Sequence, residues 1–179
     1  MVYMFLANGF EEIEALCPLD LLRRAGVEVT TVGIGSDTVM GSHGIPVIAD
    51  IPEGMFADSR PEMVILPGGM PGSKNLDESR TVDTALSVAA RQGAFIAAIC
   101  AAPMVLGRRG LLQGKEATCF PGFEGELTGA AVSQKRVVRD GNIITAAGMG
   151  VALEFGLELV AALKGHEVAE NLRRSVLAD

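Results

Sequence analysis

The segment AFIAAICAAPMVL, residues 94–106, decides how the fold is read. Its first six residues are apolar and form a run of the length typical of a buried strand. Pro103 follows shortly afterwards and marks the first turn of a helix, where a proline loses no needed hydrogen bond. Cys100 therefore stands at a strand-to-helix junction. A buried strand that leads directly into a helix is the repeating unit of α/β proteins, so this segment predicts an α/β fold.

The same alternation of strand and helix patterns extends outward over the whole chain. Helical spacing of apolar residues predicts helices at residues 12–26, 79–93, 100–110, 150–165 and 166–174. Short apolar or β-branched runs predict strands at 1–6, 27–34, 62–69, 94–99 and 115–120. A hairpin or short irregular strands are expected at 37–50, and a hairpin at 135–147. This order predicts a mostly parallel sheet with helices on both faces, within a single domain over residues 1–179.

Composition and charge exclude several classes of function. The 179 residues carry a formal net charge of −7. An acidic surface repels phosphate backbones and anionic lipids, so we expect neither a nucleic-acid partner nor a membrane partner. The three cysteines, Cys17, Cys100 and Cys119, have no metal-ligand spacing and are odd in number, so we expect free thiols and no metal. The sequence shows no signal peptide and no long apolar span, which favours a cytoplasmic protein.

Cys100 is the candidate nucleophile. The residues around it, Ala97, Ala98, Ala101 and Ala102, are small, as a sharp and strained turn requires. We therefore expect disfavoured backbone dihedrals at Cys100. The start of the following helix favours a thiolate, so we also expect a thiol pKa below the usual value of about 8.5. Free cysteines are commonly buried for packing alone, and position by itself leaves that alternative open.

Gly68 and Gly69 are candidates for stabilising a developing negative charge. They follow the strand at 62–69 in the sequence LPGGMPG. Because the carboxyl ends of parallel strands meet at one edge of a sheet, their N–H groups can point toward Cys100. Together with the N–H group of Ala101 they would form an oxyanion hole. The alternative is that the glycines only make a turn.

Glu14 is the candidate acid or base. Acids in a first helical turn are commonly explained by the helix dipole, which suffices for Glu11 and Glu12. Glu14 differs because the ring of Pro18 presses on its carbonyl, so we expect the helix to kink or begin there. A carboxyl at this place faces the cysteine turn. Partial burial beside sulfur should raise its pKa, so that Glu14 donates a hydrogen bond to Cys100 and exchanges protons with the substrate.

The sequence shows no histidine suited to complete a catalytic triad. His166 follows Gly165 at a predicted helix boundary, and His43 lies in the GSHG turn, where exposure is more typical than catalysis. Cys17 stands one position before a proline and is more typical of packing. Cys119 ends a predicted strand and is expected at the rim of the site, where an exposed thiol is open to oxidation.

Four segments carry a resemblance to a known family. They are NGFEEIEALCPLDLLRRAGVEV, VILPGGMPGSKNL, IAAICAAPMVL and DGNIITAAGMGVALEFGLELV. In this order they resemble the ThiJ/PfpI superfamily, and most of all the branch that holds the Parkinson's-associated protein deglycase and its bacterial relatives. The resemblance implies a flavodoxin-like three-layer sandwich that forms a homodimer. It also implies that Cys100 is reactive, that Glu14 is hydrogen-bonded to it, and that Gly69 and Ala101 supply backbone N–H groups.

Two departures from the family pattern bear on the pocket. Many relatives have a histidine directly before the proline in the segment that matches TCFPG, where this chain has Phe120. Many also read GPG where this chain has Gly148-Met149-Gly150. The chemistry would then rest on a Cys–Glu pair. We expect a pocket of altered shape, for which the candidate lining residues are His43, Cys119, Phe120, Gly148 and Met149.

The residues and the resemblance together support two functions of different classes. The first is a cysteine-dependent stress-protection enzyme that acts on reactive dicarbonyls, as a glutathione-independent glyoxalase or deglycase, with a small aldehyde or a glycated molecule as substrate and no cofactor. The second is a redox sensor or holdase chaperone in which Cys100 oxidises to a sulfinate without turnover. A cysteine peptidase or amidase is a third alternative, which the missing histidine disfavours.

Overall fold

The central element is a seven-stranded sheet. The structure, a computed structural model, describes residues 1–57 and 60–178. The strand order is β10-β11-β7-β6-β1-β2-β5. These strands are β1 (Val2–Leu6), β2 (Val29–Gly33), β5 (Ile51–Pro52), β6 (Met63–Leu66), β7 (Phe95–Ile99), β10 (Val137–Asp140) and β11 (Ile143–Ala146). All neighbours run parallel except β10 and β11. The predicted α/β fold with a mostly parallel sheet is confirmed.

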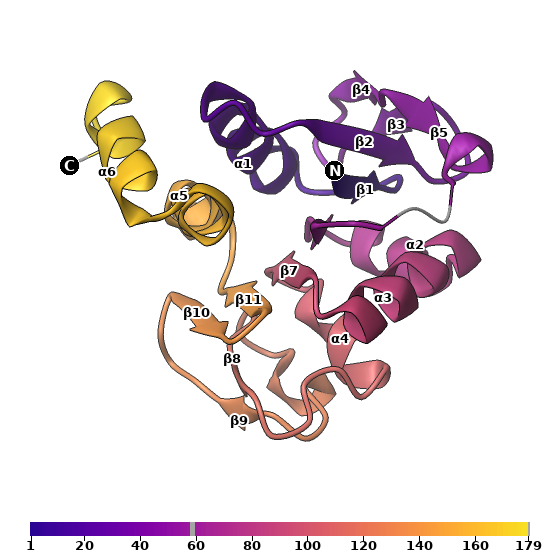
Figure 1. Cartoon of the computed structure of the whole chain (residues 1–179). Helices are drawn as coiled ribbons and strands as arrows, with labels where there is room; N and C mark the ends of the chain where they lie inside the picture. Colours follow the sequence, from indigo (N-terminus) through magenta and orange to yellow (C-terminus); the bar gives the residue numbers. More distant parts are fainter. Residues whose placement is uncertain (58–59, 179) are drawn as a thin grey trace.

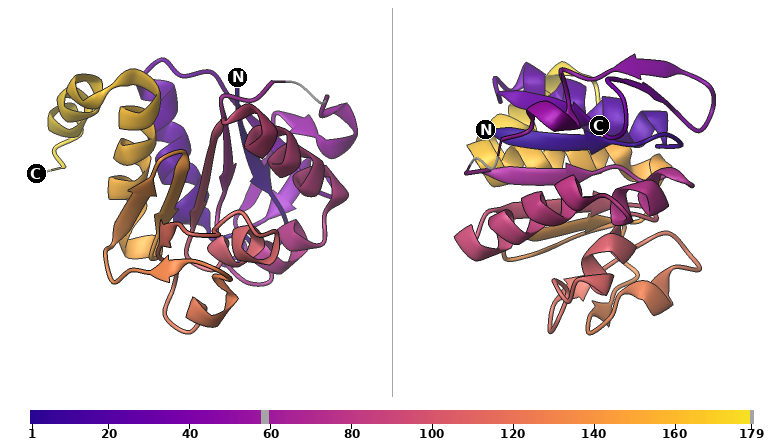
Figure 2. Two further views of the ribbon diagram at one scale, coloured as in Figure 1. Left: turned by 60° about the horizontal axis from the view of Figure 1, so that its bottom comes forward. Right: turned by 90° about the vertical axis from the view of Figure 1, so that its right-hand side faces the viewer.

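Helices cover both faces of the sheet, as predicted (Figure 1). One face carries α1 (Glu12–Arg24) and α5 (Ala152–Lys164), and the other carries α2 (Gly72–Asp77), α3 (Arg80–Gln92) and α4 (Pro103–Arg108). The last helix, α6 (His166–Ser175), packs on α5 and projects from one side of the molecule (Figure 2). Among the described residues, no helix has both the length and the apolar character needed to cross a membrane.

The core has two halves because side chains alternate along each strand. In β1, Val2, Met4 and Leu6 pack beneath α1 and α5, whereas Tyr3 and Phe5 pack beneath the helices of the opposite face. All five are buried. Burial on both faces explains why the strands of this sheet read as continuous apolar runs in the sequence.

Two predicted elements differ from those observed, and one observed helix has no predicted counterpart. The strand at 115–120 shortens to β8 (Glu116–Ala117), which pairs with β9 (Ala131–Val132) in a separate small sheet. The α2 helix was not predicted, because only a few polar residues separate the glycines from the next helix. The second difference is that α1 runs through Pro18 as one helix, so Glu14 lies within its first turn rather than at a break.

Two hairpins form: of the two alternatives for residues 37–50 the structure has the hairpin, as a separate two-stranded sheet, and the predicted hairpin at 135–147 is part of the main sheet. The first consists of β3 (Thr38–Met40) and β4 (Pro46–Ile48), and it carries the turn at 41–45. The second consists of β10 and β11, joined at Gly141, whose φ of 62° suits the turn. Short 3₁₀ turns lie at Glu53–Met55, Glu124–Glu126 and Met149–Val151. The turns after β1, β6 and β7 all lie at the carboxyl edge of the sheet, where α/β proteins place their sites.

Candidate active site

Cys100 occupies a strained elbow between β7 and α4. Its φ is 64°, a left-handed conformation that non-glycine residues rarely adopt. Backbone hydrogen bonds hold it on both sides, because its N–H donates to the Ala146 carbonyl (2.9 Å) and its carbonyl accepts the Phe120 N–H (2.8 Å). Ala101 and Ala102 are buried directly after it. The disfavoured dihedrals predicted from the sequence are confirmed, and such strain is typical of functional sites.

Gly68 is the point at which the three segments of the site meet. A Cβ atom at this position would lie 2.6 Å from the Cys100 Cβ and 2.7 Å from the Ile99 carbonyl oxygen, and it would overlap the Glu14 carboxylate. A side chain therefore has no room here. Glycine at position 68, just after β6, allows the sulfur of Cys100, which follows β7, and the carboxyl of Glu14 on α1 to approach each other.

Two of the three predicted N–H donors face the sulfur. The N–H groups of Gly69 and Ala101 both point toward Cys100 and act to lower its pKa. The N–H of Gly68 instead faces the Glu14 carboxyl and lowers the pKa of that group. Of the three N–H groups expected to form an oxyanion hole, those of Gly69 and Ala101 face the sulfur, and that of Gly68 faces the Glu14 carboxyl instead.

Glu14 is buried beside the cysteine. Its side chain has no exposed surface, and neither carboxylate oxygen makes a hydrogen bond of full geometry to any described residue. Burial raises the pKa of Glu14 to about 7. The contact with the Cys100 thiol lowers this pKa, the charge of Glu11 raises it, and the Gly68 N–H lowers it. The raised pKa predicted from the sequence is confirmed. Long contacts of this kind are typical of catalytic groups before substrate binds.

The prediction that the Cys100 thiol has a lowered pKa is wrong for this geometry. Burial, followed by the charge of Glu14 and its contact with the sulfur, raises the pKa of Cys100 to about 12, and the two N–H groups oppose this only in part. Because the two groups interact strongly, the protons leave the pair in two steps that belong to both residues. After the first step, the pair holds one proton and one negative charge.

The histidines lie where the sequence predicts, and neither touches the cysteine in the part of the chain that the structure describes. His166 begins α6. His43 is exposed, and its Nδ1 lies 3.1 Å from Glu12 Oε2. Contact with Glu12, followed by the charge of Glu11, raises the pKa of His43. The helix dipole alone does not explain Glu12, which is buried and accepts hydrogen bonds from the turn at 41–45.

The remaining candidate pocket residues divide into two groups. Phe120 and Met149 are about half exposed, and Phe120 covers Gly148, where a Cβ would lie 3.1 Å from its ring. Cys119 is buried, and burial raises its pKa to about 11, so the expectation of an exposed, oxidation-prone rim thiol is wrong. It packs in the core half opposite that of Cys100. Cys17 is partly buried against the core, as a packing residue would be.

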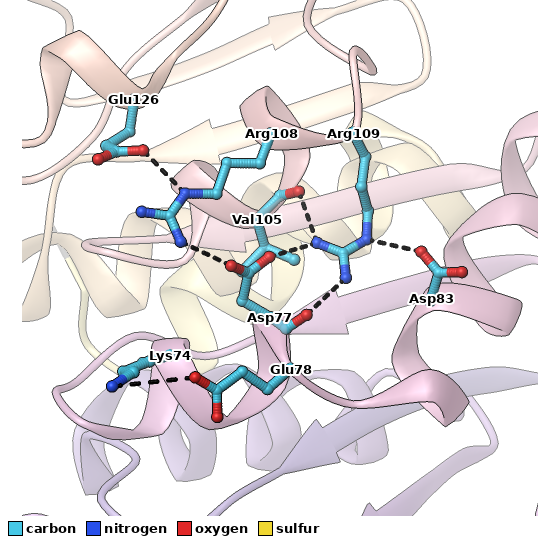
Figure 3. Close-up of polar contacts among 8 residues, drawn as sticks. All are labelled: Lys74, Asp77, Glu78, Asp83, Val105, Arg108, Arg109 and Glu126. Carbon is cyan, nitrogen blue, oxygen red and sulfur yellow. Dashed lines mark hydrogen bonds and ion pairs between the residues drawn. The ribbon is translucent and has the colours of Figure 1, made fainter.

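An ion-pair network behind the site ties α2 to α4 (Figure 3). Asp77, the last residue of α2, accepts hydrogen bonds from Arg108 (2.6 Å) and Arg109 (2.5 Å) at the end of α4. Arg108 also binds Glu126, and Arg109 also binds Asp83 on α3. The near ends of α2 and α4 follow the Gly68-Gly69 turn and the Cys100 elbow. The network therefore holds together the two helices that follow the turns carrying the N–H donors. No local pattern predicts this network, because its members are distant in the chain.

Glutamine at position 14 should remove a pH-dependent penalty on stability. The folded-state pKa of about 7 exceeds the usual value of 4.5, so the folded chain binds more protons between these values and loses stability as pH rises through them. One pKa unit corresponds to 1.36 kcal/mol. Between pH 4 and pH 8, wild type should therefore lose roughly 3 kcal/mol in its free energy of unfolding relative to Glu14→Gln. Urea denaturation at both pH values measures it.

The matched control is Glu167→Gln, which changes an exposed glutamate in the first turn of α6. For this control we expect no comparable dependence on pH. A difference between Glu14→Gln and wild type that is the same at pH 4 and pH 8 would show that Glu14 ionises normally in the folded protein.

Comparison with known proteins places this geometry in a family. Residues 1–162 match the DJ-1/PfpI family. The chain is 38% identical over 177 residues to "Protein dj-1beta" of Drosophila melanogaster, covering 97% of this chain and 95% of that one. It is 31% identical over 164 residues to "Glutathione-independent glyoxalase DJR-1.2" of Caenorhabditis elegans, covering 90% of this chain and 87% of that one.

A solved structure agrees over nearly the whole chain. The structure titled "Toxoplasma gondii DJ-1, oxidized" superposes with a TM-score of 0.95 at 35% identity, covering 98% of this chain and 97% of the other. The resemblance found in the four sequence segments is confirmed. From the match over residues 1–162 and the near full-length identity to its relatives, the chain belongs to the DJ-1/PfpI family.

Proposed function

We propose that the protein is a cysteine-dependent enzyme of the glutathione-independent glyoxalase or deglycase type, which protects a cytoplasm from reactive dicarbonyls. The observation that carries the proposal is the pairing of the strained Cys100 with the buried Glu14, which provides a nucleophile and a base in one place. A relative is named as a glutathione-independent glyoxalase, which supports the same reaction class here. With Phe120 in place of a histidine, acid–base chemistry falls to Glu14.

In the first step the sulfur of Cys100 attacks the aldehyde carbon of methylglyoxal. A C–S bond forms, the carbonyl π bond breaks, and the thiol proton passes to the Glu14 carboxylate. The oxygen becomes an alkoxide that the N–H groups of Gly69 and Ala101 stabilise. Return of the proton to this oxygen gives a hemithioacetal. The reactive state is the pair after loss of its first proton, since only then is a base or a thiolate present.

In the second step Glu14 moves a proton between neighbouring carbons. It takes the hydrogen from the former aldehyde carbon, which gives an enediolate, and returns it to the former ketone carbon. The hydroxyl proton moves from the former aldehyde oxygen to the former ketone oxygen, so a thioester remains on Cys100. Water then cleaves the thioester, and lactate and the free thiol leave. Methylglyoxal and one water thus become one lactate. One carbon is oxidised and its neighbour reduced, so no external oxidant or reductant is needed.

A redox sensor or holdase is the second candidate function. Two N–H groups that face the sulfur of Cys100 are suited to the oxygens of a sulfinate, and a protonated Glu14 would add a third donor. This function needs no turnover. A peptidase or amidase is disfavoured because both histidines lie away from Cys100 among the described residues, whereas these reactions rely on a base that also protonates an amine.

We also propose that the protein forms a homodimer through the exposed apolar face of α1 and α5. Ile13, Leu16 and Leu153 lie on these two packed helices and are 36–49% exposed. Exposed apolar side chains on a pair of packed helices offer a surface that an interface would cover. Light scattering at micromolar concentration should give twice the mass of the chain, and Ile13→Glu should shift it toward the monomer. A monomeric wild-type protein would contradict the proposal.

Lactate formation from methylglyoxal separates the enzyme from the sensor. We expect wild type to consume methylglyoxal and to release an equal amount of lactate. Cys100→Ala should abolish both, because no other group supplies the covalent intermediate. Cys17→Ala and Cys119→Ala are matched controls that should keep activity, since neither thiol lies in the site. If wild type forms no lactate while peroxide converts Cys100 to a sulfinate, the sensor is the correct function.

Turnover should rise with pH through the pKa of Glu14. That pKa is about 7, and the reactive pair exists only above it, so the rate should increase between pH 6 and pH 8. Glu14→Gln should lower the rate by about 10²–10⁴, the usual value of a general base, while Cys100 can still be alkylated at alkaline pH. The rates are measured in a chelating buffer that keeps the protein free of metal. Near-native turnover by Glu14→Gln would remove Glu14 from the mechanism.

A further inference from the structure

A second group of chemically active side chains lies where the turn at 41–45 meets the start of α1. It consists of Glu11 and Glu12 from the helix start and Ser42 and His43 from the turn. Among the described residues, Glu11, Glu12 and His43 are the group whose ligand atoms all lie within 4.8 Å of one another. The sequence separates the two segments by about thirty residues, so spacing gave no sign of this site. We infer that these side chains form a binding site for a zinc ion.

The distances between the donor atoms match a tetrahedral metal site. Ser42 Oγ lies 3.1 Å from Glu11 Oε2, 3.3 Å from Glu12 Oε2 and 3.0 Å from His43 Nδ1. His43 Nδ1 lies 3.1 Å from Glu12 Oε2 and 3.5 Å from Glu11 Oε2. Zinc bonds to nitrogen and oxygen of about 2.0–2.2 Å place the corners of a tetrahedron about 3.3–3.6 Å apart. Five of the six separations among these atoms are 3.0–3.5 Å, close to the edge lengths of such a tetrahedron.

The group also has too few protons for its contacts. With a neutral imidazole, Ser42 supplies one hydroxyl proton and His43 at most one Nδ1 proton, yet five short contacts join the four side chains. The two carboxylates give the group a charge of −2, which a divalent cation would neutralise. A cation at the centre replaces contacts between acceptors with bonds to metal.

Glu12 is held ready to bind a cation. Its Oε1 accepts the backbone N–H groups of His43 (2.8 Å) and Ile45 (3.4 Å), which leaves Oε2 turned toward Ser42 and His43. Partners that orient a ligand through its second atom are typical of protein metal sites.

The backbone around the turn fixes the second half of the site. Ser42 N–H donates to the Phe10 carbonyl (2.8 Å), which ties the turn to the residue before the helix start. A Cβ at Gly41 would overlap the Glu12 side chain, so glycine at that position makes room for the carboxylate. The two halves of the site are therefore positioned by main-chain contacts and do not depend on the ion.

The surroundings suit an ion that enters from solvent. A pocket of about 270 Å³ adjoins the site, lined by Glu11, Glu12, His43 and the apolar side chains of Ile13, Ile45 and Met149. An apolar wall strengthens electrostatic binding by excluding water. The His43 side chain is 70% exposed, so an ion reaches Nδ1 without unfolding.

Zinc fits this donor set better than other common cations. Calcium takes six to eight oxygen ligands and magnesium demands six in an octahedron, whereas this site offers three oxygens and one nitrogen. Copper(I) prefers sulfur, and copper(II) and nickel(II) prefer square-planar or tetragonal arrangements, whereas the donor separations here are close to tetrahedral. The simplest competing explanation is a protonated His43 that forms an ion pair with Glu11 and Glu12 and binds no metal. Direct titration distinguishes the two.

The test is titration of the chelator-treated full-length protein with Zn²⁺, followed by calorimetry, and with Co²⁺, followed by absorption. We expect wild type to bind one Zn²⁺ per chain. Co²⁺ should give the visible bands of a tetrahedral ion without the near-ultraviolet sulfur-to-metal band that binding at a cysteine produces. His43→Ala and Glu11→Gln should each weaken Zn²⁺ binding at least ~10-fold, the lower end of the loss seen even for residues that only support a ligand.

His166→Ala is the matched control, because it removes the other exposed histidine and keeps every thiol. It should bind Zn²⁺ as wild type does. His43 is exposed, so its replacement should leave folding intact, and circular dichroism confirms this. The proposal is overturned if wild type shows no saturable binding in the micromolar range, if His43→Ala binds as tightly as wild type, or if Cys100→Ala abolishes binding that His43→Ala retains. The last result would place the ion at the active-site pair.

Discussion

The burial of a carboxyl group against a cysteine sulfur is the constraint on which the rest of this structure depends. Glu14 is fully buried without a hydrogen bond of full geometry to a described residue, and such a group destabilises the fold unless its pKa rises. Its closeness to Cys100 requires a position between them with no side chain, which Gly68 supplies. The same burial that lowers stability at neutral pH places a carboxyl group beside a thiol. Proteins commonly retain a cost of this kind where activity depends on it.

The fold holds this pair by fixing three turns at one edge of the sheet. The elbow at Cys100 is held on both sides, because its N–H donates to the carbonyl of Ala146 in β11 and its carbonyl accepts the N–H of Phe120, and these bonds hold its strained φ in place. The Gly68-Gly69 turn and the elbow each lead toward a short helix, and Asp77 joins the far ends of those helices through Arg108 and Arg109. The N–H donors around the sulfur are thus fixed before any substrate arrives, which is what electrostatic stabilisation of a transition state requires.

Local chemistry was readable from the sequence, whereas the effects of burial were not. The strained elbow followed from small residues between a strand and a helix, and the raised pKa of Glu14 followed from its expected burial. The prediction of a lowered thiol pKa fails because the helix start is a local feature, while burial and the charge of Glu14 come from tertiary packing. The prediction of a rim position for Cys119 fails because it rests on a strand over 115–120, whereas β8 ends at Ala117. The contact of His43 with Glu12 joins distant segments and had no local signal.

The most direct measurement of the central claim, that Cys100 and Glu14 ionise as a coupled pair, is the rate of Cys100 alkylation by iodoacetamide against pH. Mass spectrometry assigns the adduct to Cys100 rather than Cys17 or Cys119, and a chelator keeps the protein free of metal. In wild type the rate should rise with a midpoint near 7, the pKa of Glu14 in the pair. In Glu14→Gln the midpoint should move upward by at least about one pKa unit, because the buried thiol must then ionise without a partner to take its proton. Identical midpoints in the two proteins would contradict the account, because the carboxyl would then play no part in activating the sulfur.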